Sequence, residues 1–227
     1  MLYYALAGVL TMIGMFVSNR LKSKFQHYSQ FGLRSGLSGR QVAEEMLQYY
    51  NIRDVRIVRG EGFLSDHYNP VSKTISLSPA VHDGRSVSAA AVAAHECGHA
   101  VQHDQAYGML QMRSTLVPLV KAASVAQGYL LMFALMMLSS MPSLLLIVII
   151  AFSITTLFSM VTLPVEFDAS NRALAWLEDS GVTSGEEHDG AKDALWWAAM
   201  TYVSAALSSF VMLVYLILRY ASASNRQ

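Results

Sequence analysis

With 227 residues, 53% of them hydrophobic and 14% charged, the chain has the composition of a membrane protein and not of an ordinary soluble domain. Its formal net charge is zero, which offers no basic surface for nucleic acid. The chain has a single cysteine, Cys97, so it cannot form an intramolecular disulfide.

The first apolar segment runs from Leu2 to about Ser18 and is long enough to span a bilayer. A basic stretch follows it from Arg20, whereas a cleavable signal peptide carries its positive charge before the apolar core. We therefore expect residues 1–19 to form a transmembrane helix with an outer N-terminus. Residues 20–113 should form a cytoplasmic region.

Soluble composition begins near Gly32. Ser38 and Gln41 form a capping-box pattern, which predicts a helix of about three turns after Ser38. Residues 55–58 predict a strand, and the Asn69-Pro70 turn predicts an antiparallel hairpin that ends in a strand at residues 73–78. That last strand could carry an extended substrate by backbone pairing, or it could merely cover the neighbouring helix.

An H-E-x-x-H sequence, His95 to His99, lies in an alanine-rich stretch from about Ser86 to Gln105 that predicts a helix. Positions i and i+4 share one helix face, so His95 and His99 can bring two imidazole nitrogens to one metal ion. Glu96 can take a proton from a water activated by that ion. Chance occurrence is the alternative for such a short motif. Cys97 points to a different face and is expected to be a packing residue.

Two further apolar regions complete the predicted membrane part. Residues 114–163 predict a transmembrane hairpin, and residues 193–227 predict a fourth span with its tail. Between them, residues 164–192 are expected to form a helix that begins near Pro164, followed by a polar loop from Ser180 to Gly190.

A catalytic zinc site needs a third protein ligand. His103 lies about 12 Å of helix rise from His95, too far to share one ion. The predicted hairpin crosses the membrane twice, so Glu166 returns to the side of the H-E-x-x-H helix and is the expected third ligand. A solvated carboxylate at a helix start is the alternative reading of Glu166.

Three stretches together resemble the YugP-type membrane zinc metallopeptidases, a gluzincin group related in layout to HtpX and the CAAX prenyl endoproteases. They are SDHYNP at residues 65–70, AHECGHAVQ at 94–102 and LPVEFDASNRA at 163–173. The resemblance covers nearly the whole chain. It implies a mainly α membrane protein with about four transmembrane helices and a small α+β zincin-like domain built around the H-E-x-x-H helix.

The same resemblance implies one zinc ion per chain, held by His95, His99 and Glu166, with Glu96 as the general base. Many gluzincins also place an aspartate four residues after the glutamate ligand, where it holds the second nitrogen of a histidine ligand. This chain has Ser170 at that position.

The partner of a ligand histidine is therefore open among Ser170, Asp168 and Asp66. The donor that would stabilise the oxyanion is likewise open, and its candidates are His67, Tyr68, Arg172 and His188. A solvated loop residue is the alternative reading of His188.

We expect a membrane-embedded zinc endopeptidase in a bacterial plasma membrane. Its partners would be the lipid bilayer and peptide or protein substrates, membrane proteins among them, but no nucleic acid. A catalytically silent zinc-bound membrane adaptor is the alternative. A metal transporter is disfavoured because the predicted spans contain few ionisable residues.

Overall fold

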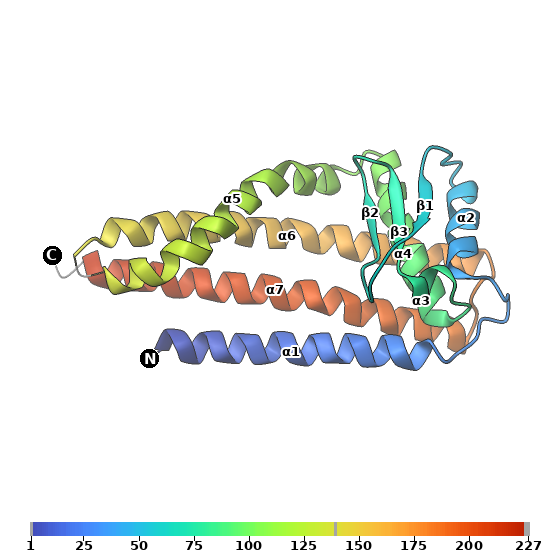
Figure 1. Ribbon diagram of the computed structural model, residues 1–227, viewed down its shortest axis with the longest axis horizontal. Helices are drawn as coiled ribbons and strands as arrows, with labels where there is room; N and C mark the ends of the chain where they lie inside the picture. Colours follow the sequence, from blue (N-terminus) through green and yellow to red (C-terminus); the bar gives the residue numbers. More distant parts are fainter. Residues whose placement is uncertain (1, 139, 225–227) are drawn as a thin grey trace. The chain divides into compact units, whose positions relative to one another are not determined.

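The part of the chain that the structure describes is mainly helical and contains one small sheet (Figure 1). The structure is a computed structural model that describes residues 2–138 and 140–224. Residue 1, Ser139 of the predicted turn and residues 225–227 of the predicted tail lie outside this range. The elements in chain order are α1 (Leu2–Tyr28), α2 (Gly39–Tyr49), β1 (Arg56–Arg59), β2 (His67–Asn69), β3 (Thr74–Leu77), α3 (Pro79–His82), α4 (Val87–Asp104), α5 (Gly108–Met136), α6 (Pro142–Asp179) and α7 (Glu186–Ser224).

Among the described residues, four helices are long and apolar enough to cross a membrane, namely α1, α5, α6 and α7. Each contains one of the apolar segments that the sequence predicts as a span. The predicted class, a mainly helical chain with four candidate spans and a small sheet, is confirmed at this level.

Pro164 lies inside α6, so the prediction that a new helix begins near this residue is wrong. Proline lacks a backbone N–H, but its fixed φ is compatible with a helix. The sequence changes from apolar to polar near Pro164, but the helix does not end there. The polar loop before α7 is also shorter than predicted, because α7 begins at Glu186.

The chain divides into two compact units. One comprises Met1–Met15, Gln111–Leu163 and Tyr202–Gln227, and the other Phe16–Leu110 and Pro164–Thr201. The first unit has an apolar core that includes the fully buried Leu145 and Leu216. The second unit contains the sheet, α2, α3, α4 and all the predicted site residues.

The sheet of the second unit has the order β1-β3-β2. β2 pairs antiparallel with β3, with His67 opposite Ser76, so the predicted hairpin is confirmed. β1 pairs parallel with β3 on its other side. Because both edges of β3 are occupied, it cannot take an added substrate strand, and of the two alternatives for residues 73–78 only the strand that covers the neighbouring helix remains. The outer edges of the sheet belong to β1 and β2.

Helix α4 lies in the core of the second unit, where it packs against α2 and contacts β2 and β3. Ser86 caps its N-terminus by accepting a hydrogen bond from the N–H of Ala89. The predicted capping box of Ser38 and Gln41 is present at the start of α2. Cys97 is fully buried in this core, as expected of a packing residue.

Candidate metal centre

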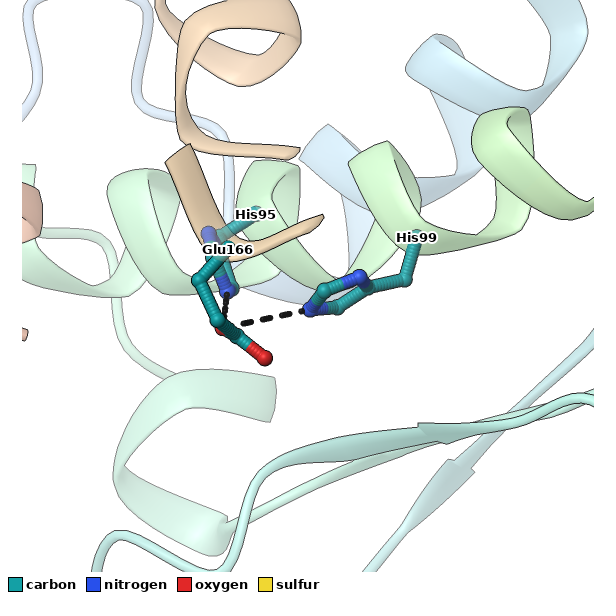
Figure 2. A group of neighbouring side chains, drawn as sticks. All are labelled: His95, His99 and Glu166. Atoms are coloured by element: carbon teal, nitrogen blue, oxygen red, sulfur yellow. Dashed lines mark ion pairs between the residues drawn. The ribbon is translucent and has the colours of Figure 1, made fainter. Parts of the chain in front are cut away.

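Two helices of the second unit bring His95, His99 and Glu166 together (Figure 2). The histidines project from α4, and Glu166 projects toward them from α6. Glu166 Oε2 lies 3.3 Å from His95 Nε2 and 3.5 Å from His99 Nε2. One ligand atom from each residue lies within 4.8 Å of the other two. The side chain of Glu166 is 2% exposed and that of His95 is 12% exposed.

The two distances from Glu166 to the histidines fit a tetrahedral zinc ion. With zinc bonds of 2.0–2.1 Å at tetrahedral angles, two ligand atoms lie about 3.3 Å apart. Both nitrogen-to-oxygen distances agree with that value, and both exceed the usual 2.7–3.2 Å range of an N–H···O hydrogen bond. Two imidazoles and one carboxylate are also a ligand set that catalytic zinc sites use, with the fourth position left to water.

Gly98 allows α4 and α6 to approach closely enough for this arrangement. A Cβ atom at Gly98 would lie only 2.5 Å from the carbonyl oxygen of Ala169. Gly98 sits between the two histidines of α4, and Ala169 follows Glu166 by three residues on α6. The absence of a side chain at this point therefore sets the spacing of the helices beside the ligand cluster.

The second ring nitrogen of each histidine has a hydrogen-bond partner. His95 Nδ1 lies 3.1 Å from Oγ of Ser170, one of the three partners that the sequence left open. His99 Nδ1 lies 3.0 Å from Oε1 of Gln102, a fully buried residue one turn further along α4. Such contacts orient both rings so that each Nε2 faces Glu166.

Glu96 is 8% exposed and follows the first histidine on α4. Burial raises the pKa of its carboxyl group. The nearby histidines oppose this rise, whereas the carboxylates of Glu166 and Asp66 add to it. Glu96 is therefore a buried carboxyl group between the two histidines in the sequence.

The hydrogen bonds that the structure describes for Asp66 and Asp168 do not go to His95 or His99. Asp66 accepts hydrogen bonds from the N–H (2.6 Å) and the hydroxyl (3.1 Å) of Ser78, and burial raises its pKa. Asp168 accepts hydrogen bonds from Gln102 Nε2 at 2.8 Å and Arg172 Nε at 2.6 Å. Asp168 therefore reaches His99 only through Gln102.

The four candidate oxyanion donors have their hydrogen-bond partners outside the ligand cluster. His67 is exposed and its Nδ1 lies 2.9 Å from the carbonyl of Ser65. Tyr68 contacts His103 Nδ1 at 2.8 Å, and burial raises its pKa to about 12. The remaining two candidates behave similarly: Arg172 is held by Asp168 and Gln105, and His188 contacts Thr183 and Glu178.

Comparison with known proteins places the chain in a family. A family model described as "Putative neutral zinc metallopeptidase" matches residues 3–221. The chain belongs to this family. It is also 38% identical over 214 residues to "Putative membrane protease YugP" of Bacillus subtilis (strain 168), a match that covers 94% of each chain. No solved structure matches it.

Family membership confirms the resemblance found in the sequence and supports a zinc-dependent protease function. The family description implies zinc, and His95, His99 and Glu166 lie together as possible ligands. The relative's name agrees with the four apolar helices of this chain.

Sequence reasoning missed two residues of the site, Gly98 and Gln102. Gln102 follows His99 by three positions, a spacing that places both on one helix face, so the pattern itself contained a signal for this contact. Gly98 had no comparable signal, because its close neighbour Ala169 lies on a different helix.

Proposed function

We propose that this chain is a membrane zinc endopeptidase of the gluzincin type, with one zinc ion held by His95, His99 and Glu166. The observation that carries the proposal is that Glu166 Oε2 lies 3.3 and 3.5 Å from the two imidazole nitrogens, close to the spacing between two ligands of a tetrahedral zinc ion. Its placement in a family of neutral zinc metallopeptidases supports the same conclusion.

A zinc ion held by these three residues would supply a Lewis acid for the scissile carbonyl and would make a water molecule acidic near neutral pH. Glu96 takes a proton from the attacking water while the water oxygen bonds to the carbonyl carbon. The same carboxyl group then gives that proton to the amine nitrogen as the C–N bond breaks. His95 and His99 direct Nε2 toward Glu166. Their Nδ1 atoms remain hydrogen-bonded to Ser170 and Gln102, respectively.

Extended substrates would pair with the outer edge of β2. This strand contacts α4, the helix that carries both histidines and Glu96. Its inner edge is bonded to β3, which leaves its outer edge for the backbone of a substrate segment. Peptide bonds in unfolded or extended segments are therefore the substrates that this arrangement favours.

The site residues would face the cytoplasm of a bacterial cell, with the apolar parts of α1, α5, α6 and α7 in the plasma membrane. The basic stretch that begins at Arg20, just after the apolar part of α1, supports this orientation. Peptides and proteins at that membrane surface, membrane proteins included, would then be the substrates.

Metal removal tests the proposal. Detergent-purified protein is stripped with a chelator, and cleavage of casein is followed before and after zinc is added back. We expect activity to disappear on stripping and to return with one zinc per chain. Glu166→Ala should bind less zinc and remain inactive at zinc concentrations that restore the wild type, because the ion loses one of its three protein ligands.

Glu178→Ala is the matched control, since it removes a carboxylate from the same helix at a side chain that is 70% exposed. It should behave as the wild type. A catalytically silent adaptor predicts zinc binding without cleavage by any variant. Cleavage that survives complete removal of the metal would contradict the proposal.

A further inference from the structure

The buried side chain of Gln102 connects the two helices that carry the three candidate ligands. It lies on α4 and is 0% exposed. Its Oε1 is 3.0 Å from His99 Nδ1. Its Nε2 donates one hydrogen bond to the carbonyl of Val165 and another to Oδ2 of Asp168, both at 2.8 Å on α6.

The partners on α6 determine which way this amide faces. The Val165 carbonyl can only accept a hydrogen bond. Asp168 Oδ2 also accepts from the guanidinium of Arg172 at 2.6 Å, so it too acts as an acceptor toward Gln102. Both partners require the NH₂ group of Gln102, which leaves its carbonyl oxygen for His99.

This orientation of the amide determines which ring nitrogen of His99 carries a proton. An amide oxygen has no hydrogen to give, so His99 Nδ1 must carry the proton of their shared hydrogen bond. In a neutral imidazole with a proton on Nδ1, the lone pair lies on Nε2. Figure 2 shows that ring nitrogen directed toward Glu166, where the ligand cluster needs a lone pair.

His95 lacks such a constraint. Its Nδ1 partner is the hydroxyl of Ser170, which can either donate or accept. The two histidines therefore differ, because only the protonation of His99 is determined by its neighbour. Gln102 also bonds the backbone immediately before Glu166, so one side chain positions ligands on both helices.

We infer that Gln102 is a positioning residue of the metal centre, which presets His99 as the Nδ1–H tautomer and holds α6 against it through Val165 and Asp168. The inference rests on the proposed zinc site. It goes beyond that site because it assigns a role to a residue that would touch neither metal nor substrate.

Zinc affinity, measured by competition with a chromophoric chelator in metal-free purified protein, tests this role without recourse to activity. Gln102→Leu should bind zinc 10- to 100-fold more weakly than the wild type, the usual effect of removing a partner of a ligand histidine. Val101→Ala is the matched control. It removes fully buried volume from the neighbouring position of α4, whose side chain lies in the apolar core. The temperature of thermal unfolding should fall in both variants, whereas zinc affinity should fall only in Gln102→Leu.

A pair of isosteric substitutions separates hydrogen-bond orientation from packing. Gln102→Glu can still accept from His99, but it places a second carboxylate against Asp168. Adding Asp168→Asn supplies an NH₂ group for the new carboxylate. We expect the double variant to bind zinc more tightly than Gln102→Glu alone, a recovery that a packing role would not produce.

Wild-type protein that binds no zinc would overturn the proposed function, and the inference with it. If the wild type binds zinc and Gln102→Leu binds it equally well, the inference alone is wrong. Equal affinities of Gln102→Glu and the double variant would likewise overturn the orientation argument.

Discussion

Substitution of Gly98 by alanine tests whether the close approach of α4 and α6 sets the metal site. The new Cβ would lie 2.5 Å from the Ala169 carbonyl oxygen, whereas ordinary contact begins near 3.4 Å. The two atoms must therefore separate by about 0.9 Å, the difference between these values. The atoms nearest to the new Cβ are backbone atoms of Ala169 on α6. They cannot move aside as a flexible side chain would, so the separation requires movement of a helix.

Such a movement acts directly on the ligand cluster. If α6 moves away from α4 by that amount, the distances of 3.3 and 3.5 Å from Glu166 to the histidines grow to about 4.2 and 4.4 Å. A tetrahedral zinc site needs about 3.3 Å between ligand atoms. A displacement of about 1 Å costs roughly 10²-fold in catalytic rate, and we expect that loss with a parallel loss of zinc affinity.

The fold itself should survive this change. Alanine in place of glycine inside a helix gains about 1 kcal/mol, whereas overpacking costs about 1–3 kcal/mol. Gly128→Ala is the matched control, because Gly128 lies inside α5 and has no heavy atom within 4 Å of an added Cβ. Zinc affinity, casein cleavage and thermal unfolding are measured for both variants. If Gly98→Ala bound zinc and cleaved casein as the wild type does, the helix-spacing argument would be refuted.

Three further predictions concern stability and reactivity in the second unit. Burial raises the pKa of Asp66 above its ordinary 3.8, so the folded state keeps this proton to a higher pH than the unfolded chain. We therefore expect the free energy of unfolding of the wild type, minus that of Asp66→Asn, to fall as pH rises from about 3.8. A difference that does not change with pH would contradict this. Ser38→Ala removes the capping box of α2 and should lower the free energy of unfolding by about 1 kcal/mol in denaturant titration, whereas no change would show that the cap is unimportant. Burial raises the pKa of the Cys97 thiol, so a thiol reagent should react with it only after unfolding, and rapid reaction of the native protein would be inconsistent with the buried position.

Local patterns were sufficient to predict much of the fold. The capping box before α2, the span of α4 and the β2–β3 hairpin all depend on residues close together in the sequence. The meeting of Glu166 with the two histidines was also predictable, because the number of apolar segments between them is even. The roles of the three residues as ligands, and of Glu96 as base, remain predictions.

Features that depend on distant contacts could not be predicted in the same way. The parallel pairing of β1 with β3 joins Arg56 to Thr74, and no local pattern encodes it, so the central position of β3 was missed. The continuity of α6 through Pro164 depends on the surroundings of the helix and not on local propensity. The need for glycine at position 98 appears only once Ala169 lies beside it.

The most direct test of the central claim compares casein cleavage by zinc-loaded wild-type protein and Glu96→Gln. Glutamine has the size of the native side chain but cannot accept the proton of the attacking water. We predict that Glu96→Gln binds one zinc per chain and loses roughly 10²- to 10⁴-fold in cleavage rate, the usual contribution of a general base. Cleavage by zinc-loaded Glu96→Gln at the wild-type rate would contradict the mechanism.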